Sequence, residues 1–169
     1  MGRLKGQDEI NNGQDIIDSR DVIDRIEWLQ PDRDALQQAI DDLTEELKDT
    51  TEDEPGVNAP FKRDEVQAML DEAEAALDEY DEGDEGQELK ALLALQEDAE
   101  GYAPDWRYGS TLIRDTYFEK YAQELAEDIG AIDKAASWPN TCIDWEQAAE
   151  ELQQDYTRIS FDGHDYWIR

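Results

Sequence analysis

Residues 157–168 read Thr157-Arg158-Ile159-Ser160-Phe161-Asp162-Gly163-His164-Asp165-Tyr166-Trp167-Ile168, and this stretch decides the fold of the 169-residue chain. Two short runs rich in β-branched and aromatic residues flank Asp162-Gly163, a dipeptide that favours a two-residue hairpin turn. In that hairpin Phe161 faces His164, Ile159 faces Tyr166 and Thr157 faces Ile168, so these six side chains share one side of the ribbon. We expect that side to pack on the preceding helix.

The residues before the hairpin predict a compact, aromatic-rich α+β module over 101–169. Asp144 has the character of an N-cap, and the helix after it has an apolar face formed by Trp145, Ala148, Ala149, Leu152 and Tyr156. An earlier amphipathic helix, ended by Gly130, carries Leu112, Tyr117, Tyr121, Leu125 and Ile129 or Ile132. Twelve of the chain's 15 aromatic residues lie in this range, so we expect the firmest core here.

The N-terminal part has a helical pattern. Residues 1–15 are polar and aperiodic and predict a flexible arm. Residues 16–49 predict a helical hairpin or a coiled-coil segment, because a heptad stripe broken only by Arg33 runs through them. Pro31 favours two helices, Ser19–Leu29 and Pro31–Lys48, over one rod. The stripe makes a homodimer a candidate assembly, with oligomerisation residues Val22, Ile26, Leu29, Leu36, Ile40, Leu43 and Leu47.

Two segments lie between these parts. Residues 50–61 contain Pro55-Gly56 and Pro60 and predict a linker. Residues 62–100 predict an acidic helical segment whose pattern breaks at 81–86. The expected fold class is therefore mainly α with a small C-terminal β-hairpin (α+β), with an elongated helical N-terminal part before the compact module.

The charge of the chain excludes several functions. With 46 acids against 15 bases the formal net charge is -31. Such a chain lacks the clustered Lys and Arg that bind nucleic-acid phosphates, and an anionic membrane surface repels it. Residues 1–63 carry 17 acids and 8 bases, residues 64–100 carry 15 acids and Lys90, and residues 101–169 carry 14 acids and 6 bases. The middle segment is thus the most charged.

Catalytic and metal-binding patterns are nearly absent. The single His164 and single Cys142 supply no ligand set for zinc, and no phosphate-binding glycine loop occurs. Two registers of an EF-hand loop around Asp78–Glu88 fail, because Tyr80 or Gly83 falls on the third ligand position. We therefore expect no enzyme activity, no cofactor and no metal site. One cysteine and no apolar run of about 18 residues predict a cytoplasmic protein.

The density of acids permits phosphate mimicry. If residues 64–100 formed one helix, they would span about 55 Å. Fourteen net charges over that length give about one per 4 Å, near the roughly 3.4 Å spacing of phosphates along one DNA strand. The candidate phosphate-mimicking residues are Asp71, Glu72, Glu74, Asp78, Glu79, Asp81, Glu82, Asp84, Glu85 and Glu88, with Glu119, Glu124, Glu127, Asp128, Glu146, Glu150 and Glu151 as an extension.

A resemblance to a known family adds to this pattern. The run Ile143-Asp144-Trp145-Glu146-Gln147-Ala148-Ala149-Glu150-Glu151-Leu152-Gln153-Gln154-Asp155-Tyr156 resembles the antirestriction motif of the ArdA family, in which a hydrophobic residue, Asp, an aromatic and Glu lead into a short acidic helix. Residues 117–125 resemble an imperfect second copy, and the closing hairpin that ends at Arg169 is also similar. Glu150 stands where the family usually carries Arg. The chain also resembles uncharacterised phage and prophage proteins.

The resemblance implies an elongated, dimeric DNA mimic that occupies the DNA groove of type I restriction-modification enzymes. We therefore expect a phage- or plasmid-encoded inhibitor that acts in the host cytoplasm on a basic, DNA-binding defence enzyme, with no direct binding to nucleic acid or membrane. The alternative is an acidic helical scaffold that binds a partner through its aromatic C-terminal module, with its acidity serving solubility or salt adaptation. In that case Trp145 and Trp167 would carry the binding.

Overall fold

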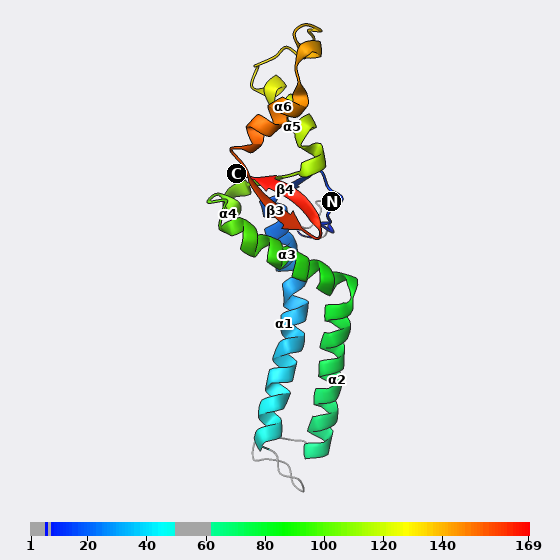
Figure 1. Cartoon of the computed structure of the whole chain (residues 1–169). Helices are drawn as coiled ribbons and strands as arrows, with labels where there is room; N and C mark the ends of the chain where they lie inside the picture. Colours follow the sequence, from blue (N-terminus) through cyan, green and yellow to red (C-terminus); the bar gives the residue numbers. More distant parts are fainter. Residues whose placement is uncertain (1–5, 7, 50–61) are drawn as a thin grey trace, which may run out of the picture. The chain divides into compact units, whose positions relative to one another are not determined.

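A computed structural model of the chain describes residue 6 and residues 8–49 and 62–169 (Figure 1). The linker predicted over 50–61 lies outside the described residues. The elements are β1 (Ile16–Asp18), α1 (Ser19–Asp49), α2 (Arg63–Glu82), α3 (Asp84–Glu100), α4 (Trp106–Gly109), β2 (Thr111–Arg114), α5 (Phe118–Asp128), α6 (Trp145–Gln153), β3 (Thr157–Phe161) and β4 (His164–Ile168), with short 3-10 helices at Asp115–Tyr117 and Asn140–Cys142. The expected class, mainly α with a small C-terminal β structure, is confirmed.

The chain divides into two compact units, and their bounds differ from those of the predicted domains. One unit combines residues 1–25 with residues 91–169, and the other contains residues 26–90. Both α1 and α3 therefore begin in one unit and end in the other. We call residues 1–25 and 91–169 the sheet unit and residues 26–90 the helical unit.

The predicted hairpin is confirmed in its register. Thr157 pairs with Ile168, Ile159 with Tyr166 and Phe161 with His164. Asp162 and Gly163 both have positive φ, 44° and 78°, as a type I′ turn requires. The local turn chemistry therefore sets the pairing of β3 and β4.

Two further strands extend this hairpin into an antiparallel sheet with the order β1-β2-β4-β3. The sequence pattern did not predict either of them. Leu112, which we expected in a helix, lies in β2 opposite Ile17 of β1. Leu112 and Ile113 are both fully buried although adjacent side chains of a strand point to opposite faces, so both faces of the sheet are covered at β2.

The preceding helix packs on the other side of the ribbon from the one predicted. Ile113 pairs with Trp167, and both contact a cluster that contains Phe118 and Ala122 of α5 and Ala149 of α6. We predicted that the side with Ile159, Phe161 and Tyr166 packs on the preceding helix, and this prediction was wrong. α5 and α6 instead cover the opposite side, where Trp167 supplies the aromatic surface. The opposite side buries Ile159, Phe161, Tyr166 and Ile168, while His164 is exposed.

Part of the predicted N-terminal arm lies against the sheet. The Tyr166 hydroxyl donates to the backbone carbonyls of Asn12 and Gln14, at 3.1 and 2.7 Å. The Asn12 side chain donates to the carbonyl and the carboxylate of Asp162 in the hairpin turn, and Ile10 is buried. Residues 10–14 are thus held by specific contacts rather than behaving as a loose tail, a difference that arises because their partners are about 150 residues away in sequence.

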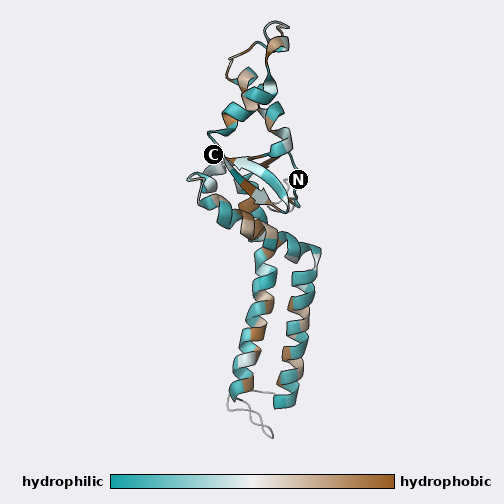
Figure 2. Cartoon of the chain, in the orientation of Figure 1, coloured by the Kyte–Doolittle hydropathy of each residue, from teal (hydrophilic) through white to brown (hydrophobic). Residues whose placement is uncertain are grey.

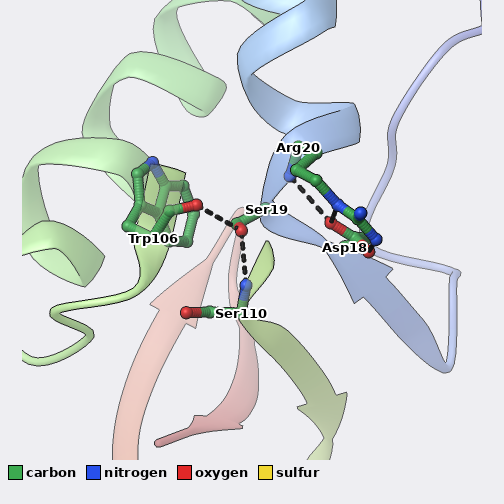
Figure 3. Close-up of polar contacts among 5 residues, drawn as sticks. All are labelled: Asp18, Ser19, Arg20, Trp106 and Ser110. Atoms are coloured by element: carbon green, nitrogen blue, oxygen red, sulfur yellow. Dashed lines mark hydrogen bonds and ion pairs between the residues drawn. The ribbon is translucent and has the colours of Figure 1, made fainter. Parts of the chain in front are cut away.

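The junction of β1 and α1 is fixed by a fully buried serine (Figure 3). The Ser19 hydroxyl donates to the Trp106 carbonyl at 2.6 Å and accepts from the Ser110 amide at 2.7 Å. Its backbone amide donates to the Ser110 carbonyl at 2.9 Å. Beside it, the Asp18 carboxylate accepts from the Arg20 amide and guanidinium, and this hydrogen bonding lowers the pKa of Asp18.

In the helical unit, α1 and the antiparallel α2 form a hairpin of two helices. The Arg63 guanidinium donates to the Leu47 carbonyl at one end. At the other end the Tyr80 hydroxyl donates to the Leu29 carbonyl at 2.9 Å, and the Arg33 guanidinium makes two hydrogen bonds to Asp81, at 2.8 and 3.0 Å.

These contacts explain why Pro31 does not divide the helix. We expected two helices, but α1 is continuous from Ser19 to Asp49 with Pro31 inside it. Proline removes one backbone hydrogen bond of a helix, and the side chains at the end of α2 bind the turn on either side of Pro31. The expectation was wrong because it considered only the local backbone.

The predicted oligomerisation stripe packs within the chain. Val22, Ile26 and Leu29 are buried, and Leu36, Ile40, Leu43 and Leu47 are half-buried. On α2, Val66 and Leu70 are buried. The first three residues of the stripe are therefore not available to a second copy, and the homodimer stays a prediction.

The break that we predicted at 81–86 is confirmed, because the acidic segment 62–100 forms two helices. The span of about 55 Å that we calculated for a single helix therefore does not apply. α2 ends at Glu82, the amide of the following Gly83 donates to the Glu79 carbonyl, and α3 begins at Asp84. Gly86 is buried against the end of α2, where a Cβ atom would lie 2.1 Å from the Tyr80 carbonyl oxygen and 2.7 Å from the Asp81 Cα. Only glycine permits this close approach of two backbones.

We predict that Gly86→Ala destabilises the corner between α2 and α3 by about 1–3 kcal/mol, because the added methyl group forces two backbone segments apart. Urea unfolding followed by helical circular dichroism measures this change. Gly101→Ala is the control, since its Cβ would lie at an ordinary 3.7 Å from the Asp98 carbonyl oxygen. Equal stability of the two variants would contradict the close approach.

We also predict that Ser19→Ala lowers the free energy of unfolding by about 1–3 kcal/mol, because it leaves the Ser110 amide without its buried acceptor. Ser160→Ala, at an exposed position of β3, should change stability by less than about 0.5 kcal/mol. Thermal unfolding of both variants tests the difference, and a neutral Ser19→Ala would show that the junction does not hold the sheet unit together.

Candidate functional site

The acidic hairpin, defined as residues 26–49 of α1 and Arg63–Glu82 of α2, is the most charged described structure. It contains 17 acids and 3 bases, a net charge of -14 over 44 residues. Figure 2 colours most of its residues hydrophilic, with hydrophobic residues interspersed. The buried and half-buried apolar residues of each helix supply most of the contact between the two helices. Most of the acids are exposed, whereas Glu46 and Asp81 are half-buried.

Acids on α2 recur as adjacent pairs every seven residues. The pairs are Asp64-Glu65, Asp71-Glu72 and Asp78-Glu79, and all six residues are exposed. Because seven helical residues rise about 10.5 Å, the pairs repeat at nearly the length of three phosphate steps of about 3.4 Å each. The rows lie on the face of α2 opposite buried Val66 and Leu70.

The α1 helix adds a row that the sequence prediction missed. Glu27, Asp34 and Asp41 are also spaced by seven residues, and each is exposed. Asp32, Asp42 and Glu45 are exposed on the same helix. An acidic heptad runs beside the apolar heptad of this segment, and it is the signal that could have found this row. The prediction of the helix rested on the apolar positions alone.

Several of these carboxylates accept hydrogen bonds from neutral glutamine side chains one helical turn earlier. Gln37 donates to Asp41 at 3.1 Å, Gln38 to Asp42 at 2.8 Å and Gln67 to Asp71 at 2.7 Å. Many helices place Lys or Arg at such positions, which pairs the carboxylate with a cation. A glutamine amide orients the carboxylate and leaves its negative charge in place.

The predicted acids on α2 and α3 divide into two groups. Most are exposed, namely Asp71, Glu72, Glu74, Asp78, Glu79, Glu82, Asp84 and Glu85. Asp81 binds Arg33 within the hairpin, and this contact raises the pKa of Arg33. Glu88 is partly buried. Asp81 therefore has a structural role in holding α1 to α2.

The predicted extension lies in the sheet unit, on α5 and α6. Glu119, Asp128, Glu146, Glu150 and Glu151 are exposed there. Glu124 accepts from the Tyr117 hydroxyl at 2.8 Å and Glu127 pairs with Lys134 at 3.1 Å. These two carboxylates therefore already bind partners within residues 117–134. The structure thus brings the α2 acids together in one hairpin and places the extension in the other unit.

The described residues contain no group of His, Cys, Asp and Glu arranged to hold a metal ion. His164 is exposed on the β3–β4 hairpin beside the Asp162 carbonyl, and Cys142 is a free, exposed thiol. No helix in the described ranges has the length and apolar character needed to cross a membrane.

The two tryptophans of the alternative hypothesis differ in their contacts. The Trp167 indole donates to the Asp115 carboxylate at 2.8 Å, and its ring lies against Phe118 with centroids 5.9 Å apart. Trp145 is half-buried at the start of α6, after the Asp144 side chain that caps this helix by accepting from the Gln147 amide. Substitution of Trp167 would remove these contacts, so a Trp167 variant does not separate partner binding from folding.

Comparisons of the chain with protein-family models, with curated proteins and with solved structures found no match. The resemblance to the ArdA family therefore stays a prediction.

Proposed function

We propose that the protein is a DNA mimic that inhibits a DNA-binding enzyme of a host defence system, such as a restriction-modification complex. The acidic hairpin presents its carboxylates to the basic groove of that enzyme in place of DNA phosphates. Paired, exposed acids that repeat at about 10.5 Å along α2 are the observation that carries this proposal.

The glutamine contacts of the hairpin support this role for the charge. A chain that needed acids only for solubility would gain helix stability from Lys or Arg one turn away from each acid. The contacts from Gln37, Gln38 and Gln67 instead order the carboxylates and keep their charge. Ordered side chains lose less conformational entropy when a partner binds.

The mechanism follows from competition for one groove. Cationic side chains that hold DNA attract the hairpin as well, and a bound hairpin excludes the duplex. Because both interactions depend on opposite charges, the affinity falls as salt screens them. The protein needs no catalytic group for this inhibition.

The test measures displacement of a labelled duplex from a purified type I restriction-modification complex. We predict that wild-type protein displaces the duplex and that its inhibition constant rises steeply between about 50 and 300 mM salt. The variant with Asp71→Asn, Glu72→Gln, Asp78→Asn and Glu79→Gln should inhibit at least about tenfold less strongly, a loss of about 1.4 kcal/mol.

A matched control separates the position of the charges from their number. The variant with Glu97→Gln, Asp98→Asn, Asp105→Asn and Asp155→Asn removes four exposed acids of the sheet unit. Its net charge equals that of the variant changed at positions 71, 72, 78 and 79. We expect it to inhibit nearly as well as wild-type protein. Equal losses in both variants, or inhibition that salt leaves unchanged, would contradict mimicry by the hairpin.

A further inference from the structure

The sheet unit contains a small cavity beside the end of α4 and the strand β2, which we call the tyrosine cavity. Its volume is about 200 Å³, below the roughly 300–1,000 Å³ of sites that hold drug-sized ligands. A ligand of this cavity is therefore a molecule of few atoms. The lining includes Asp105, Thr111, Ile113, Tyr121, Tyr156 and Arg169.

The core of the sheet unit holds the lining of the tyrosine cavity in place. Ile113 of β2 is fully buried in one cluster with Phe118 of α5, and Tyr121 and Tyr156 pack against that cluster. Thr111 lies on the same face of β2 as Ile113, because side chains two positions apart in a strand share a face. The cavity is therefore built on the face of β2 that α5 and α6 cover.

The two tyrosine hydroxyls of the lining are hydrogen-bonded to each other, at 3.0 Å. Whichever hydroxyl donates, the other accepts and keeps its own proton, and neither has a second partner among the described residues. Burial, together with the hydrogen bond to Tyr121, raises the pKa of Tyr156 to about 12, so this hydroxyl stays protonated at neutral pH. The pair therefore has one O–H group to donate to an oxygen atom of a ligand.

One base and one acid are the charged side chains of the described lining. The guanidinium carbon of Arg169 lies 5.4 Å from the centroid of the Tyr156 ring, and within the described residues Arg169 forms no ion pair. Asp105 is exposed, and its side chain does not cap α4. Both charged groups are therefore open to a ligand that carries the opposite charges.

The balance of charge selects among small ligands. The lining has no net charge, whereas the chain carries -31 and repels a free anion. A lone cation would pair with Asp105 but would leave Arg169 without a partner in the cavity. A zwitterion has no net charge, and it brings a carboxylate to Arg169 and the tyrosine pair and an ammonium group to Asp105.

We propose that the tyrosine cavity binds a small zwitterion of the amino-acid class. Arg169 and the hydroxyl pair of Tyr121 and Tyr156 hold its carboxylate, and Asp105 holds its ammonium group. This goes beyond the proposed function, because the cavity belongs to the sheet unit and no residue of the acidic hairpin lines it among the described residues.

The test follows the tyrosine resonances of the full-length protein by nuclear magnetic resonance during titration with three probes. L-alanine carries both charged groups, propionate lacks the ammonium group and ethylammonium lacks the carboxylate. We expect L-alanine to shift the resonances of Tyr121 and Tyr156 to saturation, and the other two probes to bind at least about tenfold more weakly. Propionate that binds as tightly as L-alanine, or tyrosine resonances that L-alanine leaves unchanged, would overturn the proposal.

Matched variants connect the binding to the two charges of the lining. Arg169→Gln and Asp105→Asn should each weaken L-alanine binding at least about tenfold, and both residues are exposed, so the core stays intact. Arg107→Gln and Asp98→Asn remove an exposed base and an exposed acid outside the lining and should leave the affinity unchanged. Equal losses in the lining variants and in these controls would contradict a site in the cavity.

The variant changed at positions 71, 72, 78 and 79 separates this proposal from DNA mimicry. It should bind L-alanine as wild-type protein does, and Arg169→Gln should displace a duplex from the target enzyme as wild-type protein does. A failure of either proposal therefore leaves the other standing.

Discussion

The buried Ser19 hydroxyl is the contact on which the rest of the structure depends. It joins the N-terminal strand to Trp106 and Ser110, residues that lie about 90 positions later. This contact places β1 beside β2 at the edge of the sheet and starts α1 in the same turn. Because α1 leaves the sheet unit here and the chain returns along α3, the acidic hairpin is an insertion between two parts of one unit. A weaker junction would separate the sheet from its first strand.

Like charge is the second constraint, and the hairpin meets it by arrangement rather than by neutralisation. The apolar contact between α1 and α2 is narrow, with many half-buried residues. Two polar contacts at the Pro31 turn, from Tyr80 and from Asp81, supplement it. Most of the acids stay on the outer faces, where water and counterions lower their repulsion. Glutamines order some of these carboxylates without removing charge. The result is a stable support for closely spaced negative charge, which is the property that phosphate mimicry requires.

The sequence predicts what local chemistry determines. Asp162-Gly163 sets the register of β3 and β4, and Asp144 caps α6 as expected. The strands β1 and β2 have three and four residues and pair across about 95 positions, so no local turn sequence predicts them. The continuity of α1 through Pro31 depends on contacts with α2. The close approach of Gly86 to Tyr80 and Asp81 depends on the corner between α2 and α3. At the candidate sites, the α2 acids were predicted and the α1 row was not.

Under the proposed function, the acidic hairpin and DNA occupy the same groove of the target enzyme. Sedimentation of a purified type I restriction-modification complex with a labelled duplex and with this protein, each at saturating concentration, tests this most directly. Mimicry predicts two separate populations, enzyme with duplex and enzyme with protein, and no particle that contains all three. A stable ternary complex that cleaves no DNA would show inhibition at a separate site and would contradict mimicry.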